Sequence, residues 1–144
     1  MKLSTNTRYA IRIIFELAGA SEPVSSALLA EKAGLTLRAV ENIQALLKQH
    51  GITSGTVGPK GGISLEKPLS AISLGDMIML FDSGIEFAVC CGEKSNDCPN
   101  QNTCETRSVW RAVSGEIQRE LNQISLETIL HRYPQQGGMI LAHM

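Results

Sequence analysis

The chain has 144 residues, of which 43% are hydrophobic, 19% are charged and 4% are aromatic. This composition fits one globular domain, with or without a dimerisation element, and argues against a disordered chain. No apolar run reaches the ~20 residues of a membrane span. No signal-peptide pattern follows Met1, so we expect a cytoplasmic protein without membrane contact.

The net charge of −1 is unevenly distributed along the chain. Residues 1–70 carry eight Lys and Arg against five Asp and Glu, a net of +3, whereas residues 71–144 carry five against nine, a net of −4. Such a division can mark a basic, ligand-facing half next to an acidic half.

The first predicted element is an amphipathic helix over residues 5–19, TNTRYAIRIIFELAG. Its apolar residues recur at helical spacing, and Gly19 supplies a C-terminal stop. Arg8 and Arg12 lie four residues apart and share one face, where they could meet phosphate groups.

Two more helices predict a helix-turn-helix. Ser25 is the expected N-cap of a short helix that ends at Gly34, and Thr36 is the expected N-cap of LRAVENIQALLKQH, which closes at Gly51. Three apolar residues of the second helix face inward, namely Val40, Ile43 and Leu47. The outer face of its first turns, where a recognition helix meets base edges, carries Arg38, Glu41 and Asn42.

The segment GITSGTVGPKGGISLEKP predicts two short strands around a Pro/Gly turn. A β-hairpin directly after a helix-turn-helix is a wing, with Lys60 at its tip to reach a phosphate. We expect Gly61 and Gly62 to adopt positive φ and pass close to DNA. Residues 1–70 are therefore predicted to form a winged helix-turn-helix DNA-binding domain.

In the second half, Ser73 and Asp76 predict a capping box that opens a helix. A long helix is expected from its N-cap Thr103, with an apolar stripe formed by Trp110, Val113, Ile117, Leu121 and Ile124. So narrow a stripe needs a partner. The same helix of a second subunit is the simplest one, and packing on its own domain is the alternative. We assign residues 71–132 to a sensor loop and dimerisation helices, and residues 133–144 to a flexible tail. The predicted fold class is mainly α.

All four cysteines lie in one polar loop, CCGEKSNDCPNQNTC, at residues 90–104. Such a loop offers little apolar surface to bury thiols, so a functional role is favoured. Zinc sites usually use C-x2–4-C pairs, which are absent here. A thiol–disulfide switch needs only two of the cysteines. An iron–sulfur cluster takes thiolates from such a loop.

Taken together, these stretches resemble the IscR/NsrR/CymR family of bacterial winged-helix repressors over about residues 1–130. The resemblance is carried by LSTNTRYAI, AVENIQALLKQHGI, VGPKGGISL, ISLGDMI and Cys98-x5-Cys104 followed by Trp110. It implies a homodimer on a palindromic double-stranded DNA operator. It also implies an iron–sulfur cluster (2Fe-2S or 4Fe-4S) on Cys91, Cys98 and Cys104, with Cys90 as substitute or fourth ligand.

The chain departs from the family pattern at several positions. The wing has Val57 and Ile63 where an Arg and a Tyr are usual, and Ala39 replaces an aromatic of the recognition helix. Glu41 keeps the family's acidic position, which can accept from cytosine N4. Arg107 stands where a His can be the fourth cluster ligand.

These features predict a transcription regulator, in particular a repressor, whose operator affinity follows the cluster or the redox state of the cysteines. The expected DNA contacts are Arg8, Thr36, Arg38, Glu41, Asn42, Lys60 and Gly61. No catalytic motif is present, so an enzyme is not expected. The alternatives are a winged-helix protein-interaction module, or a zinc or dithiol switch with weak or no DNA binding.

Overall fold

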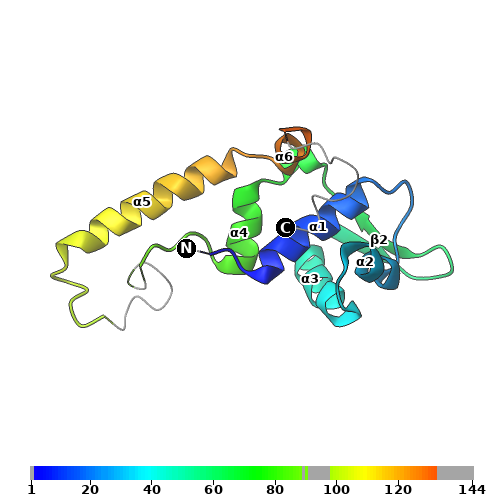
Figure 1. Ribbon diagram of the computed structural model, residues 1–144, viewed down its shortest axis with the longest axis horizontal. Helices are drawn as coiled ribbons and strands as arrows, with labels where there is room; N and C mark the ends of the chain where they lie inside the picture. Colours follow the sequence, from blue (N-terminus) through cyan, green and yellow to red (C-terminus); the bar gives the residue numbers. More distant parts are fainter. Residues whose placement is uncertain (1, 89, 91–97, 133–144) are drawn as a thin grey trace.

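The computed structural model describes residues 2–88, 90 and 98–132 (Figure 1). In chain order the elements are α1 (Thr5–Ala18), α2 (Ser26–Ala33), α3 (Leu37–Gln49), β1 (Thr53–Thr56), β2 (Gly62–Leu65), the 3-10 turn η1 (Leu69–Ala71), α4 (Leu74–Asp82), α5 (Glu105–Asn122) and α6 (Leu126–Arg132). Helices α1, α2 and α3 gather with the hairpin at one end, α4 packs beside α1, and α5 extends away from them (Figure 1). The predicted fold class, a mainly α winged helix-turn-helix with a long helix in its second half, is confirmed.

Helix α1 lies at the centre of the core. Its residues Ala10, Ile13 and Ile14 are fully buried, at the three- and four-residue spacing of one helical face. The helix packs against α2, α3, β2 and α4. Burying an Ile side chain contributes about 1.5–3 kcal/mol, so this face is a main source of stability.

The turn between α2 and α3 is set by local side-chain chemistry. Ser25 caps α2, because its hydroxyl accepts from the N–H of Leu28 at 3.2 Å. Gly34 ends α2 with φ of 66°, a left-handed conformation that glycine adopts without a Cβ clash. Thr36 then caps α3. The predicted helix-turn-helix is therefore confirmed.

The hairpin β1–β2 pairs antiparallel, with Thr53 opposite Leu65 and Thr56 opposite Gly62. Ile63 also exchanges backbone hydrogen bonds of 2.9 and 2.8 Å with Val24, which anchors the wing to the segment before α2. The predicted β-hairpin wing is confirmed.

The glycines of the wing turn differ in part from the prediction. Gly62 has a positive φ of 159°, as predicted, Gly58 has a φ of 121°, and Gly61 has no positive φ. A Cβ on Gly61 would stand 2.9 Å from the carbonyl carbon of Thr56, so Gly61 is required by the turn's own backbone. The prediction of positive φ is therefore confirmed at Gly62 and wrong at Gly61, because the other positive φ of this turn is at Gly58.

Helix α4 begins with the predicted capping box. Ser73 Oγ accepts from the N–H of Asp76, Asp76 Oδ2 accepts from the N–H of Ser73, and both distances are 2.9 Å. The helix ends at Asp82, and Ser83 follows in a left-handed conformation with φ of 60°. Helix α4 packs against both α1 and α5, so it connects the winged helix to the long helix.

The long helix differs from the prediction at both ends. Its N-cap residue is Cys104, and the hydroxyl of Thr103 instead donates to the carbonyl of Asn100 at 3.4 Å. Its C-cap is Gln123, so Ile124 lies beyond the helix and not on its stripe. The helix stops there because the backbone of this segment pairs with the start of α4. Ile124 O accepts from Leu74 N at 2.8 Å.

The short helix α6 is not predicted by the sequence. Its first residue, Leu126, is fully buried, and the N–H of Leu126 donates to Ile72 O at 2.8 Å. Ile72, Met77 and Leu126 belong to the same core as α1, so the two halves of the chain share one hydrophobic core. The domain boundary at residue 70 stays a prediction. The expected tail, residues 133–144, lies outside the described residues, and none of the helices described here is both long and apolar enough to cross a bilayer.

Candidate nucleic-acid interface and cysteine site

The outer face of α3 is polar and exposed. Arg38, Glu41 and Asn42 all face solvent, whereas Val40 and Ile43 on the opposite side are buried. Three side chains that can read base edges thus project together from the first two turns. Thr36 lies at the start of this surface, but its hydroxyl accepts from the N–H of Ala39 at 3.2 Å. The hydroxyl of Thr36 is therefore engaged in holding the helix end.

The wing presents a second exposed cation. Lys60 lies in the turn between β1 and β2, and its side chain is exposed beside the exposed Val57. Gly61 is half-buried and shapes the turn that carries Lys60. This geometry suits a contact to the phosphate backbone, which positions a protein without reading sequence.

The two arginines of α1 are half-buried. Arg8 Nη2 donates to the hydroxyl of Thr5 at 3.3 Å, at the end of α1 that meets α4. The guanidinium of Arg12 lies 5.9 Å from the ring centre of Tyr9, a cation–π distance. Arg12 also approaches the turn at Gly34, where its Nη2 would be 3.8 Å from an added Cβ. Arg12 is thus placed beside the helix-turn-helix.

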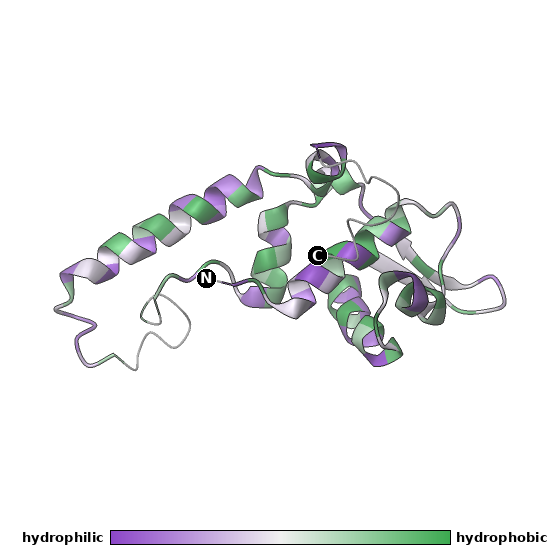
Figure 2. Ribbon diagram, in the orientation of Figure 1, coloured by the Kyte–Doolittle hydropathy of each residue, from purple (hydrophilic) through white to green (hydrophobic). Residues whose placement is uncertain are grey.

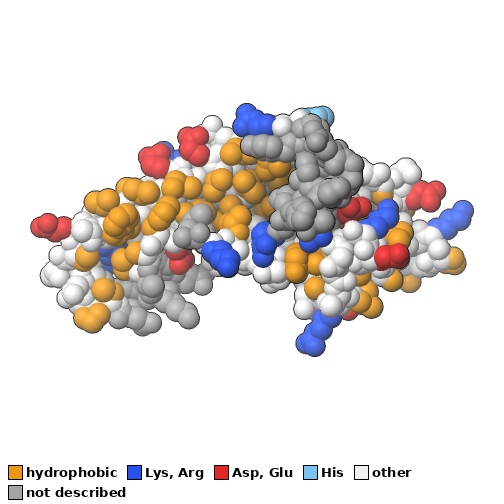
Figure 3. Space-filling model, in the orientation of Figure 1, with side chains coloured by type: hydrophobic (Ala, Val, Ile, Leu, Met, Phe, Trp, Pro, Cys, Tyr) orange, Lys and Arg blue, Asp and Glu red, His pale blue; other side chains and the backbone are white. Residues whose placement is uncertain are grey.

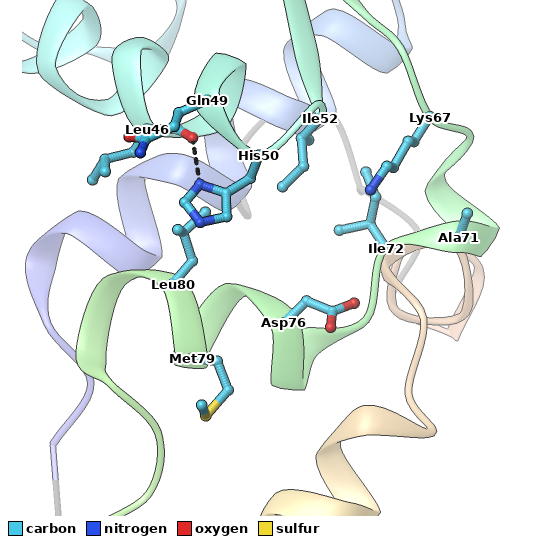
Figure 4. Close-up of a pocket in the computed structure, with 10 residues that line it drawn as sticks. All are labelled: Leu46, Gln49, His50, Ile52, Lys67, Ala71, Ile72, Asp76, Met79 and Leu80. Atoms are coloured by element: carbon cyan, nitrogen blue, oxygen red, sulfur yellow. Dashed lines mark hydrogen bonds between the residues drawn. The ribbon is translucent and has the colours of Figure 1, made fainter.

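A pocket of about 540 Å³ lies between the end of α3 and α4 (Figure 4). It is lined by Leu46, Gln49, His50, Ile52, Lys67, Ala71, Ile72, Asp76, Met79 and Leu80. Figure 4 shows His50 above Leu80, with its Nδ1 3.0 Å from Leu46 O. The exposed Leu46 and Met79 contribute apolar surface.

Three of the four cysteines lie in the described part of the loop. Cys90, Cys98 and Cys104 are free thiols and half-buried, whereas Cys91, a predicted ligand, lies outside the described residues. A tight turn joins Cys98 to Cys104. Within it Gln101 N donates to Cys98 O at 3.2 Å, and Cys104 N donates to Asn100 O at 2.9 Å.

Cys104 occupies an electrostatically favourable position at the start of α5. Its Sγ lies 3.2 Å from the hydroxyl of Thr106, and that hydrogen bond lowers the pKa of the Cys104 thiol below its usual value. The backbone N–H groups of Arg107 and Thr106 and the charge of Arg107 lower the pKa further. Thiolates are the metal-binding and nucleophilic form of cysteine, so Cys104 is prepared for either role.

The described cysteines fit a thiolate-bound group by chemistry. Free thiols are the ligands of iron–sulfur clusters and of many zinc sites. Among residues 2–88, 90 and 98–132, however, no three His, Cys, Asp or Glu side chains are gathered so as to hold a metal ion. The described part of the loop thus offers suitable donors without assembling them.

Comparison with known proteins identifies the family. The sequence model of Rrf2, described as an iron-dependent transcriptional regulator, matches residues 3–132. The chain belongs to the Rrf2 family. As a member it is a DNA-binding transcriptional regulator and not an enzyme, as the sequence predicted.

Two individual relatives support the assignment of this chain to the Rrf2 family. Protein rrf2 of Nitratidesulfovibrio vulgaris is 30% identical over 132 residues, which cover 90% of this chain and 87% of the relative. The HTH-type transcriptional regulator IscR of Yersinia pseudotuberculosis is 32% identical over 133 residues, which cover 91% and 80%.

Solved structures share the fold. The structure of IscR from T. potens matches with a TM-score of 0.67 and 28% identity, over 96% of both chains. CymR of B. subtilis matches with a TM-score of 0.71 and 23% identity, over 92% of this chain and 98% of that one. The CymR likeness supports the winged-helix fold alone.

The Rrf2-family chain also exposes a group of large apolar side chains on and near α5, which we call the α5 apolar surface. It consists of Val109, Trp110 and Val113 of α5 together with Met79 and Phe87. Figure 2 shows hydrophobic residues alternating with hydrophilic ones along α5, and Figure 3 shows apolar side chains forming a band over this helix. Of the remaining predicted stripe residues, Ile117 and Leu121 are half-buried.

Three residues of this Rrf2-family regulator have structural roles that its sequence motifs do not predict. Asp82 hydrogen bonds to the start of α1, Gly75 lies against α5, and Arg107 bonds to both sides of the cysteine loop. Each acts on a partner distant in the chain, so no local pattern reveals it. Only the position of Arg107, three residues after the last cysteine, is a sequence signal.

Proposed function

We propose that this protein is a homodimeric repressor whose affinity for a palindromic operator is controlled by an iron–sulfur cluster on the cysteine loop. The exposed residues Arg38, Glu41 and Asn42 would read bases in the major groove, and Lys60 and Arg8 would contact phosphates. Gly61 would shape the wing for that contact, and Thr36 would hold the start of the recognition helix. Two such surfaces in a dimer meet half-sites one helical turn apart, ~34–36 Å.

A single relationship carries the proposal: Cys104 is the N-cap of the helix that bears the α5 apolar surface. Any change in how Cys104 is held therefore acts directly on the first turn of α5. Helix α5 in turn packs on α4, and α4 packs on α1 of the winged helix. This chain of contacts supports coupling between the cysteine loop and the spacing of two recognition helices.

The ligands in this proposal are Cys91, Cys98 and Cys104, with Cys90 as substitute or fourth ligand. An iron–sulfur cluster supplies a redox-active and nitric-oxide-sensitive group when it is bound. The protein's contribution is a set of thiols on a polar loop, with the pKa of the Cys104 thiol lowered by Thr106 and Arg107. A coupling of ~1–3 kcal/mol between the two states would change operator affinity ~5–150-fold.

Dimerisation is proposed through the α5 apolar surface. Val109, Trp110 and Val113 are 53%, 43% and 37% exposed, which is unusual for large apolar side chains on one helix face. The half-buried Ile117 and Leu121 would extend the contact toward the C-terminal end of the helix. Ile124 would contribute only at its edge, because it lies beyond α5.

The deciding experiment is anaerobic reconstitution followed by operator binding. We expect stoichiometric iron and sulfide, and different operator affinities of the cluster-loaded and metal-free protein at one fixed salt concentration. Cys98→Ser should lose the cluster, and with it the difference in operator affinity between the two preparations. Stoichiometric zinc, or full cluster retention in Cys98→Ser, would support a zinc or dithiol switch instead. Absence of binding to the chain's own upstream DNA in every state would support a protein-interaction module.

The dimer is tested separately by Val113→Glu, which places a charge in the α5 apolar surface without entering the core. Ala112→Glu is the matched control, since Ala112 lies on α5 with an exposed side chain about 100° away from Val113. We expect Val113→Glu to be monomeric in analytical ultracentrifugation and Ala112→Glu to remain dimeric. Two dimeric variants would remove this surface from the interface.

A further inference from the structure

One side chain hydrogen bonds to both sides of the described cysteine loop. Arg107 lies in the first turn of α5 and is half-buried. Its Nε donates to the carbonyl of Cys90 at 3.3 Å, and its Nη1 donates to the carbonyl of Gln101 at 2.9 Å. The two carbonyls belong to the two ends of the loop, so a single guanidinium keeps these ends together.

Arg107 is also connected to the other two described cysteines. Its backbone N–H donates to the carbonyl of Cys104 at 3.4 Å. Gln101, whose carbonyl accepts from Nη1, donates its own N–H to the carbonyl of Cys98 at 3.2 Å. The backbones of Cys90, Cys98 and Cys104 are therefore all within two hydrogen bonds of Arg107.

The chemistry of arginine suits this arrangement. A guanidinium is planar and presents its donors in a fixed fork, so Nε and Nη1 can bind two separate carbonyls at once. A lysine carries the same charge on a single nitrogen and lacks that fork. Both bonds are charge-assisted and therefore stronger than bonds between neutral groups.

We propose that Arg107 is the positioning residue of the cysteine site, because it joins the backbone of Cys90 to the turn that contains Cys98 and Cys104 before any metal is bound. The connection between Cys90 and residues 98–104 follows from the hydrogen bonds alone. Its consequence, faster and fuller loading of a cluster, rests on the proposed function.

The first arm of the test uses metal-free protein and amide hydrogen exchange. Arg107→Ala removes both bonds, so the amides of Gln101, Thr103 and Cys104 should exchange about tenfold faster or more. Arg107→Lys keeps the charge but not the fork, and should give an intermediate rate. Arg111→Ala, one turn further along α5 with an exposed side chain, removes the same charge and should exchange like wild type.

The second arm measures iron and sulfide per chain and the visible absorption spectrum after anaerobic reconstitution. We expect the iron and sulfide content to be highest in wild type and Arg111→Ala, lower in Arg107→Lys and lowest in Arg107→Ala. If Arg107 acted only through its charge, Arg107→Lys would contain as much iron and sulfide as wild type.

Each outcome decides one of the two proposals. Wild-type exchange rates in Arg107→Ala, full recovery by Arg107→Lys, or an equal effect of Arg111→Ala would overturn the positioning role. Full cluster content in Arg107→Ala would overturn its consequence for loading. If wild-type protein takes up no iron and sulfide, the proposed function fails, and the exchange arm still decides whether Arg107 holds the loop.

Discussion

The carboxylate of Asp82 accepts a hydrogen bond of 2.5 Å from the hydroxyl of Thr7, a contact that joins residues 75 positions apart. Asp82 is the last residue of α4, and Thr7 lies in the first turn of α1. The backbone N–H of Ser4 also donates to the two carboxylate oxygens at 3.2 and 3.3 Å. The end of α4 is thereby fixed to the start of α1, and a carboxylate stands where the helix dipole of α1 favours negative charge.

Replacing Asp82 should destabilise the fold. Asp82→Ala leaves the fully buried hydroxyl of Thr7 without this acceptor, and hydrogen bonds to charged groups contribute about 1.5–3 kcal/mol. We expect the free energy of unfolding, measured by urea titration, to fall by about that amount. Glu86→Ala, an exposed carboxylate just beyond α4, is the control and should change it by less than about 0.5 kcal/mol. Equal stabilities of the two variants would contradict a stabilising role for the contact.

Gly75 marks the closest approach of α4 to α5. A Cβ at this position would overlap the side chain of Asn122 and stand 2.8 Å from its backbone nitrogen. Gln118 Nε2 donates to Gly75 O at 3.1 Å across the same contact. We expect Gly75→Ala to separate the helices and lower the free energy of unfolding by about 1–3 kcal/mol, as overpacking usually does.

The matched control for this substitution lies on α5 itself. Gly115 has no atom within 4 Å of an added Cβ, so Gly115→Ala should stabilise α5 by about 0.5–1 kcal/mol through helix propensity. Chemical denaturation of both variants gives the comparison. A stabilised Gly75→Ala protein would show that the close approach is not maintained in solution.

The elements of this fold were predictable where local chemistry sets them. Ser25, Thr36 and Ser73 cap their helices through side chains that bond three residues ahead, and sequence spacing shows such caps directly. The end of α5 was not predictable, because the apolar spacing continues to Ile124 while the backbone there pairs with Leu74. A backbone hydrogen bond between residues 50 positions apart thus accompanies the end of the helix, although the apolar spacing continues.

The candidate site, like the fold, was predictable only where local helical spacing sets it. The outward position of Arg38 and Glu41 follows from helical spacing alone. The bonds of Arg107 to Cys90 and Gln101 depend on how the loop returns to α5, which no pattern in the loop encodes. The sequence therefore located the cysteines but did not predict the bonds that Arg107 makes beside them.

The lowered pKa of the Cys104 thiol leads to a pH prediction for metal-free protein. Because the thiolate of Cys104 is favoured by Thr106, its alkylation by iodoacetamide should reach half-maximal rate at a lower pH than that of an ordinary cysteine thiol in a short peptide. Thr106→Val removes the side-chain bond and should move the midpoint for Cys104 upward. Peptide mass spectrometry after timed alkylation measures each thiol. A midpoint unchanged in Thr106→Val would assign the effect to the backbone N–H groups.

The last prediction concerns how the winged helix reads DNA. Arg38 is exposed in the first turn of α3, where an arginine can make a bidentate contact to guanine, and Lys60 is exposed in the wing, where we propose a contact to a DNA phosphate. Arg38→Ala should weaken binding to the mapped operator by about 1–3 kcal/mol and reduce discrimination against a scrambled site. Lys60→Ala should weaken binding to operator and scrambled DNA equally. It should also reduce the slope of log affinity against log salt concentration by about one.

Fluorescence anisotropy at several salt concentrations distinguishes the two contacts. Arg111→Ala, which removes one positive charge on α5 away from the proposed DNA face, corrects for the change in net charge. If Arg38→Ala lowered affinity for operator and scrambled DNA by the same factor, Arg38 would be a phosphate contact. Sequence reading would then have to come from Glu41 and Asn42, the other exposed side chains of this helix face.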